Sequence, residues 1–401
     1  MTVQPDTTPS PTATGIARWQ PIALGVGVLG IALSILGFVT NRGVFFRAWL
    51  PSWLFWFSIC AGSLAVLMLQ YVTGGEWGLM IRRPLGAASR SMWVLVLLFL
   101  PIVVGFREIF PWANPAWPDF HEIQELKGFY LNPKFFFIRA IGYFIFFLLW
   151  AWRIRVLSLE FYRNRSPYTE LSRRKWAASG IVFVVLVMTF ASIDWMMSTE
   201  PKWYSTMYGI TFVVGCGLSA FAFVTFFLSR LAHTEAMAEV LRPQHLRDLG
   251  NLLLAFVMFY AYTSFSEYLL IWYANLHEEI PHYLTRQHGV WGVLAALLIL
   301  FHFFLPFFML LLRPIKDRPK TIGAVTVIII VMRYVAIYWL VAPSWYGDAF
   351  AYSWMDLTSL VGIGGIWLWA FIGQLKGQTI IPIHETWVEE AIREGALKVN
   401  A

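Results

Sequence analysis

The chain has 401 residues, of which 58% are hydrophobic, 18% are aromatic and only 13% are charged. This composition is that of a polytopic membrane protein and excludes an ordinary water-soluble domain. The net charge of +7 must therefore be explained together with the membrane.

Ten stretches of the sequence are long enough to cross a bilayer as helices. They lie at about 22–40, 51–73, 91–110, 134–155, 177–196, 209–229, 250–275, 289–312, 321–341 and 354–375. Their apolar runs are continuous and do not alternate with polar residues, which excludes a β-barrel. We therefore predict an all-α polytopic membrane protein with ten transmembrane helices.

The distribution of Lys and Arg predicts the orientation, because cytoplasmic loops retain an excess of both. With the N-terminus inside, the inner side holds 21 of these residues and the outer side 8, while Arg333 lies within a span. We expect a multi-pass protein of the cell (inner or plasma) membrane with both termini cytoplasmic. The net charge then reflects orientation, and no nucleic-acid partner is expected. The basic run 153–175 could contact anionic lipid or a partner, or form a solvated loop.

Two polar tails flank the spans. Residues 1–20 begin with a Pro- and Thr-rich stretch that has no apolar core, so we expect a disordered cytoplasmic tail and no cleaved signal peptide. The transmembrane domain should cover residues 21–376. Residues 377–401 should form a cytoplasmic tail, either solvated or as a short helix on the membrane surface.

The sequence offers no ligand set for a metal or haem. Cys60 and Cys216 lie in different spans without the spacing of a zinc or iron–sulfur site, and of eight histidines only His302 lies well within a span. We expect no metal centre and no covalently bound cofactor in this chain. Redox centres, if it takes part in electron transfer, would belong to a partner or to a diffusible quinone or menaquinone.

Ionisable residues nevertheless occur in the spans. Glu267, His302 and Arg333 lie deep, while Asp194 and Glu108 lie near the outer ends of two other spans. An isolated charge at the middle of a membrane costs roughly 2.5 to 3.5 kcal/mol on insertion scales, so such groups indicate function by default.

The seventh span places several polar groups on one helical face. Tyr260, Ser264, Glu267 and Asn275 follow each other at offsets of 0, 4, 7 and 15. Such a row could relay protons or hold a quinone head group through hydrogen bonds. The alternative is that these groups bond neighbouring helices, at about 0.6 kcal/mol each.

The direction of each span places the acidic residues toward the outer face. This clustering suits proton release or quinol deprotonation there, with Arg333 as the charge partner of one carboxylate. The alternative is a buried structural ion pair accompanied by interfacial charges. His302 has wholly apolar neighbours, and could be a proton carrier or a neutral histidine bonded to an adjacent helix.

A faint internal repeat suggests how the spans pack. FREIFPWAN, ending the third span, is similar to FSEYLLIWYAN, ending the seventh. Both spans run in the same direction and lie four helices apart, as a parallel duplication requires. We predict two four-helix bundles, made of spans two to five and six to nine, with the first and tenth spans outside them.

Three longer motifs carry a resemblance to a known family. SIDWMMSTEPKWYSTMYG (192–209), FSEYLLIWYANLHEEIPHY (265–283) and HFFLPFFMLLLRPIKDRP (302–319) resemble segments of the NrfD-like membrane subunits of bacterial alternative complex III. The chain is more similar to the smaller of the two such subunits, the second quinone-binding subunit, because of its length and short tail.

The resemblance implies an integral subunit of a quinol:electron acceptor oxidoreductase that carries no metal itself. Its partners would be a sister NrfD-like subunit, an iron–sulfur subunit and haem c subunits. Asp194, Glu267 and Arg333 would be the matching polar positions, serving a quinone pocket or a proton path. The alternatives are a structural membrane anchor of such a complex and a stand-alone secondary transporter.

Overall fold

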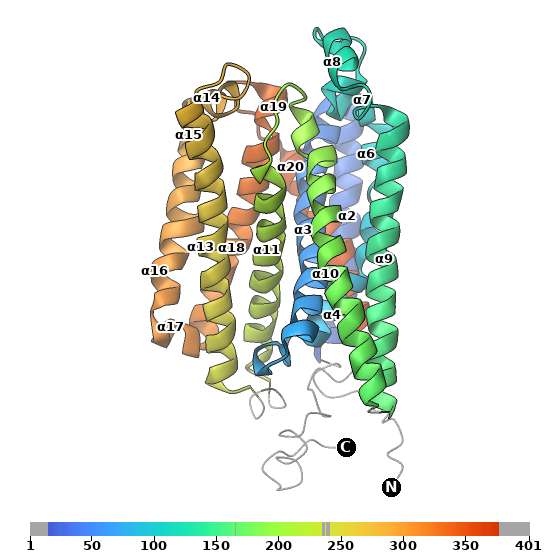
Figure 1. The fold of residues 1–401 in the computed structure, drawn as a ribbon, viewed down its shortest axis with the longest axis vertical. Helices are drawn as coiled ribbons and strands as arrows, with labels where there is room; N and C mark the ends of the chain where they lie inside the picture. Colours follow the sequence, from blue (N-terminus) through green and yellow to red (C-terminus); the bar gives the residue numbers. More distant parts are fainter. Residues whose placement is uncertain (1–14, 165, 235–236, 238–240, 377–401) are drawn as a thin grey trace, which may run out of the picture.

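The computed structural model describes residues 15–164, 166–234, 237 and 241–376, and in these ranges every regular element is a helix. The helices run roughly parallel along the long axis of the molecule (Figure 1). Ten of them are long and apolar enough to cross a membrane, which confirms the predicted all-α polytopic class.

Eight spans are single helices: α2 (Trp19–Thr40), α3 (Arg42–Thr73), α9 (Pro133–Asn164), α10 (Pro167–Trp195), α11 (Met207–Leu231), α13 (Pro243–Ala274), α18 (Pro319–Val341) and α20 (Trp354–Leu375). The third span is divided into α4 (Arg82–Arg90), α5 (Met92–Leu97) and α6 (Leu100–Val104). The eighth span is divided into α15 (Gly289–Leu297), the π-helical η4 (Leu298–Phe304) and α16 (Leu305–Leu311).

Short helices close the two ends of the molecule. In Figure 1 the lower face is the end at which α2 begins and α20 finishes, and the upper face is the opposite end. The short helices are η1 (Glu76–Gly78) and α17 (Arg313–Asp317) at the lower face, and α7 (Phe106–Ile109), η2 (Pro111–Ala113), α8 (Phe120–Lys127), η3 (Met197–Thr199), α14 (Pro281–Gln287) and α19 (Pro343–Tyr346) at the upper face.

The two predicted four-helix bundles are present. Spans two to five pack together through α3, α4, α9 and α10, and spans six to nine pack through α11, α13, α16 and α18. The bundles meet along α3 and α11. A Cβ atom on Gly62 would lie only 1.9 Å from the carbonyl oxygen of Cys216, and Ser58 and Ser219 share a hydrogen bond of 3.2 Å nearby. Small residues therefore let the central helices touch.

The first and last spans pack on each other outside the bundles. Glycines of α2 and α20 interdigitate, since a Cβ on Gly30 would lie 2.6 Å from the Cα of Gly362 and one on Gly27 would meet the backbone of Gly365 at 2.8 Å. One turn further on, the hydroxyl of Ser34 bonds Thr358 at 3.0 Å. α20 also packs against α3 and α4, so the pair closes one side of the first bundle.

The structure corrects two predicted boundaries. The first candidate span covers Gly15–Thr40, so helical residues begin before the predicted boundary at residue 20; residues 1–14 and 377–401, which hold most of both predicted tails, lie outside the described ranges. The third span runs from Arg82 to Val104 and not to residue 110. The helix ends at Gly105, where a Cβ would lie 2.2 Å from the Phe46 ring, and Glu108 follows in the separate α7.

Candidate functional site

The second bundle brings three of the predicted polar residues together. The Tyr260 ring, on α13, lies 4.9 Å from the His302 ring of η4 in an edge-on arrangement. On its other side, the guanidinium carbon of Arg333, on α18, lies 4.6 Å from the centre of the same ring. We call Tyr260, His302 and Arg333 the midspan cluster. A cation over an aromatic face is stabilised by the ring quadrupole, more so when water is excluded.

The site of the Arg333 guanidinium is made by the neighbouring helix α11. Arg333 Nε donates to the Ser219 hydroxyl at 3.2 Å. A Cβ on Gly215 would lie 2.4 Å from Arg333 Nη2, so only glycine leaves room for the group. Within the described residues Arg333 forms no ion pair, and the prediction that it partners a carboxylate is therefore wrong.

Above the cluster, α13 carries the other two polar residues predicted for this face. Ser264 and Glu267 follow Tyr260 by one and two turns, which spans about 10 Å along the helix. Glu267 is buried, with 4% of its surface exposed, and lies near Ser205 and within electrostatic reach of Arg286. Asn275 does not join them: it is exposed and closes α13 in the left-handed conformation at φ 47°. Asn275 therefore serves as the C-terminal cap of α13 and is not part of its polar face.

Four buried polar atoms at this site have no hydrogen-bond partner. They are Ser264 Oγ, Glu267 Oε1, His302 Nε2 and Arg333 Nη1. Leaving a buried donor or acceptor unsatisfied costs about 1 to 3 kcal/mol, and more for a charged group. Such a concentration in one bundle indicates a site where water or a ligand completes the hydrogen bonds.

His302 lies in the π-helical segment η4, which the sequence did not reveal. Pro306 follows four residues later, and its ring nitrogen cannot donate to the His302 carbonyl. The helix widens at this point and resumes as α16. Single π-helical turns often occur at functional sites, because they turn a side chain out of the regular helical register.

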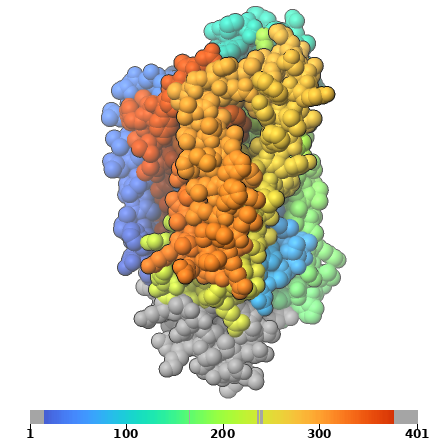
Figure 2. Space-filling view, turned by 90° about the vertical axis from the view of Figure 1, so that its left-hand side faces the viewer, coloured from blue at the N-terminus to red at the C-terminus, as the bar shows by residue number. Residues whose placement is uncertain are grey.

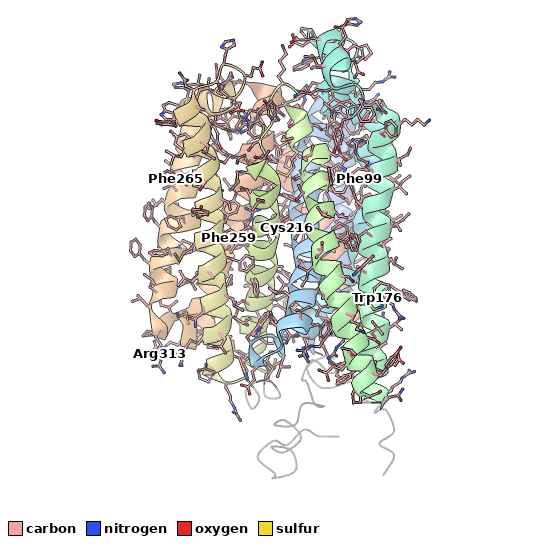
Figure 3. The ribbon with its side chains drawn as sticks, viewed as in Figure 1. Phe99, Trp176, Cys216, Phe259, Phe265 and Arg313 are labelled. Atoms are coloured by element: carbon pink, nitrogen blue, oxygen red, sulfur yellow. The ribbon has the colours of Figure 1, made fainter. Side chains whose placement is uncertain are left out.

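A hollow lies between the seventh and eighth spans. α13 packs on α16 and α17 toward the lower face, whereas toward the upper face a recess separates α13 from α15 (Figure 2, yellow and orange). Phe259 and Phe265, on the outer surface of α13, are about half exposed or more and would face lipid (Figure 3). The polar face of α13 therefore borders a recess in a surface that is otherwise apolar.

A second polar group, which we call the upper triad, consists of Glu200, His282 and Arg286. Glu200 follows η3, and the other two residues lie on α14. His282 Nδ1 lies 2.6 Å from one Glu200 oxygen, and Arg286 Nη2 donates to the other oxygen. The His282 ring also stacks on Trp203 at 3.8 Å between centroids.

The Arg286 side chain is buried, with 1% of its surface exposed, and its N–H groups are hydrogen-bonded. Besides Glu200, it donates to the backbone carbonyls of His282 at 2.8 Å and Leu340 at 2.7 Å. Its charge also reaches Glu267. The upper triad therefore lies between the buried Glu267 and the upper face.

Charges within the upper triad set the protonation of its members. Burial opposes ionisation of Glu200, but the charges of Arg286 and His282 and the hydrogen bonds from both together outweigh it and lower the pKa of Glu200 to about 2. Burial, with the same Arg286 charge, lowers the pKa of His282 to about 4. At neutral pH the carboxylate is ionised and the imidazole is neutral. Because a carboxylate can only accept, His282 Nδ1 carries the proton and donates.

The remaining predicted residues lie elsewhere. Asp194 is fully buried in the first bundle, where it receives two hydrogen bonds of 2.8 Å from Arg139 and one of 2.7 Å from Tyr143. Its acceptors are satisfied, as in a structural ion pair. Glu108 is exposed on α7. The structure therefore brings neither acid next to Glu267.

Sequence reasoning missed the upper triad. Glu200 and His282 stood in motifs used for the resemblance, but they lie in predicted loops, where charged residues are common. Glu200 lies 82 positions before His282 and 86 positions before Arg286, so no local spacing pattern could have revealed the contacts.

No group of three or more His, Cys, Asp or Glu side chains within the described ranges could hold a metal ion. Neither a model of a known protein family nor a curated protein matches this chain.

Proposed function

We propose that this chain is an integral membrane subunit of a respiratory quinol:electron acceptor oxidoreductase of the alternative complex III type. It would correspond to the smaller NrfD-like subunit and would lie in the cell (inner or plasma) membrane with both termini cytoplasmic. Its partners would be the sister NrfD-like subunit, the iron–sulfur subunit and the haem c subunits. The chain itself would carry no redox centre.

One observation carries the role of the site: four buried, unpartnered polar atoms lie on helices that border a recess in a lipid-facing surface. A quinone or menaquinone is apolar enough to enter from lipid, and its two ring oxygens need hydrogen-bond partners. Arg333 Nη1 can donate to a quinone carbonyl, while Glu267 Oε1 can accept from a quinol hydroxyl. These complementary roles are what a head-group pocket requires.

Oxidation of a quinol to a quinone releases two electrons and two protons. The electrons would pass to redox centres of the partner subunits. The protons would leave through Glu267, which lies in the upper half of α13, toward the upper triad and the predicted outer face.

The test is Glu267→Gln in the assembled complex, with Glu108→Gln as the control that removes the same charge from an exposed position. We expect the first variant to lower proton-coupled quinol turnover by tenfold or more with assembly intact, and the second to leave turnover unchanged. Equal turnover and proton release in both variants would remove Glu267 from the mechanism.

The satisfied Asp194–Arg139 pair favours a second role for the first bundle, that of a structural anchor. An anchor alone would predict that Glu267→Gln reduces the amount of complex while the remaining complex turns over normally. The ratio of turnover to assembled complex therefore separates the two functions.

A further inference from the structure

Arginine side chains gather at the lower face of the first bundle, far from the site described above. They come from both ends of α4, the lower part of α9 and the start of α10, and most of them lie around the aromatic residues Tyr71 and Tyr162. We call this group the lower arginine cluster; its members are Arg82, Arg83, Arg90, Arg155 and Arg173.

Arg173 is the centre of this cluster. Only 5% of its surface is exposed. Its guanidinium carbon lies 4.5 Å from the Tyr71 ring and 4.4 Å from the Phe161 ring, so the planar group is held between two aromatic faces. Such stacking fixes its orientation without using its N–H donors.

Two of these donors remain unused. Arg173 Nε and Nη1 are buried and have no hydrogen-bond partner. No carboxylate within the described ranges forms an ion pair with Arg173. Burying a charged donor without an acceptor is costly, so the arrangement points to an anionic acceptor that completes it.

The surrounding groups suit the same ligand. Arg83 lies 5.3 Å from the Tyr162 ring, and the charges of Arg82, Arg83 and Arg173 all reach this residue. Arg90 and Arg155 are close enough for their charges to repel. Arg90 itself donates to Gln374 of α20. Positive groups near one another are stabilised by an anion among them, and guanidinium is the side chain best suited to phosphate oxygens.

We propose that the lower arginine cluster binds a phosphate group, with Arg173 as its central donor, and that in the membrane this phosphate belongs to an anionic phospholipid. The cluster lies where the spans α3, α9 and α10 reach the lower face, at head-group depth. Exposed apolar side chains of α9 and α10, Leu159 and Leu171, lie beside it and would contact acyl chains. The predicted cytoplasmic side is also where basic pockets between spans meet anionic head groups.

The test uses the full chain purified in mild detergent and stripped of lipid. Phosphatidylglycerol, phosphatidylcholine or inorganic phosphate is added in separate arms, and the unfolding temperature and bound mass are measured. We expect phosphatidylglycerol to bind and to raise the unfolding temperature, and the other two to have little effect. Stabilisation by inorganic phosphate as strong as that by phosphatidylglycerol would instead indicate a soluble phosphate ligand.

Arg174 supplies the matched control, because it is the next residue on α10 and its side chain is exposed. We expect Arg173→Gln to weaken phosphatidylglycerol binding by tenfold or more and Arg174→Gln to change it by less than threefold. Equal losses in both variants would show that only the general positive charge of this face attracts lipid, and would overturn the proposal.

Arg173→Lys covers the case in which Arg173→Gln does not fold. It keeps the charge and loses the planar group that fits between two rings, so we expect a folded protein with weakened phosphatidylglycerol binding. Unchanged binding in a folded Arg173→Lys protein would count against Arg173 as the specific donor.

Discussion

Arg286 donates to the carboxylate of Glu200 across 86 positions of sequence; the arginine side chain is 1% exposed and the glutamate side chain 20%. The pair ties α14 to the segment that joins η3 to α11. It therefore fixes the upper ends of the fifth to eighth spans, next to the buried Glu267.

Glu200→Gln should destabilise the protein strongly. Removing one partner of a buried ion pair leaves the other charge uncompensated, which typically costs about 3 to 5 kcal/mol. The measurement is thermal unfolding in detergent. Asp317→Asn is the control, since this carboxylate is about as exposed as that of Glu200 but its partner Arg247 is about one-quarter exposed, whereas Arg286 is 1% exposed. Exposed pairs contribute little, and the control should unfold almost as the wild type does. Equal unfolding temperatures for the two variants would contradict the assigned burial.

Acidification should loosen the upper face in two steps. The pKa of His282 is about 4 in the fold against 6.5 as its ordinary value, so the unfolded chain takes up this proton first and stability falls between about pH 6.5 and 4. The pKa of Glu200 is about 2 against 4.5, so stability falls again from about pH 4.5 downward. Each difference of about 2.5 in pKa corresponds to a loss on the order of 3 kcal/mol.

Hydrogen exchange of the α14 backbone, followed as a function of pH, measures this loosening. The protection factors, which compare each exchange rate with the intrinsic rate at the same pH, should fall below pH 6.5 in the wild type. In His282→Gln, which cannot be protonated, the first step should be absent while the acid step remains. A first step of the same size in this variant would assign it to another group.

Gly62→Ala should separate the two bundles. Its Cβ would meet the Cys216 carbonyl oxygen at 1.9 Å, and backbone atoms cannot move aside as a flexible side chain can. We expect a loss of about 2 to 3 kcal/mol or failure to assemble. Gly142→Ala, on the exposed side of α9 with no atom within 4 Å, should be neutral or stabilise by up to about 1 kcal/mol. Both unfolding temperatures come from one detergent assay.

Substitutions of Tyr260 should distinguish the contribution of its ring from that of its hydroxyl. Tyr260→Phe keeps an aromatic face for Arg333, so its free energy of unfolding should stay within about 1 kcal/mol of the wild type. Tyr260→Leu removes this face and should lower the free energy of unfolding by about 1 to 2 kcal/mol. If the hydroxyl takes part in proton transfer, turnover falls in both variants. If only the ring matters, turnover falls in Tyr260→Leu alone.

Much of the fold was predictable because lipid imposes a simple rule. A span needs a continuous apolar run of about 20 residues, and such a run is visible without any knowledge of packing. The two bundles were predictable from a weak repeat, although Glu108 and Glu267, the residues that suggested it, lie in different environments. One is exposed on a four-residue helix and the other is buried in a continuous span.

The site was predictable only along one helix. Periodicity correctly placed Tyr260, Ser264 and Glu267 on one face of α13, because their spacing is local. The position of Arg333 over an aromatic ring, and not beside a carboxylate, depends on a glycine at position 215 of another helix. Such a relation between distant helices has no local sequence pattern.

The packing of α2 against α20 sets an order of events during synthesis. More than 300 residues separate the two helices, so at about 5 to 20 residues per second the first span waits roughly 15 to 60 seconds for its partner. During this time the backbone of Gly27 and Gly30 faces lipid or the insertion machinery. A protein that occupies this glycine face in the nascent chain would shield it until the last span arrives, and the two ends of the chain would be the last parts of the fold to come together.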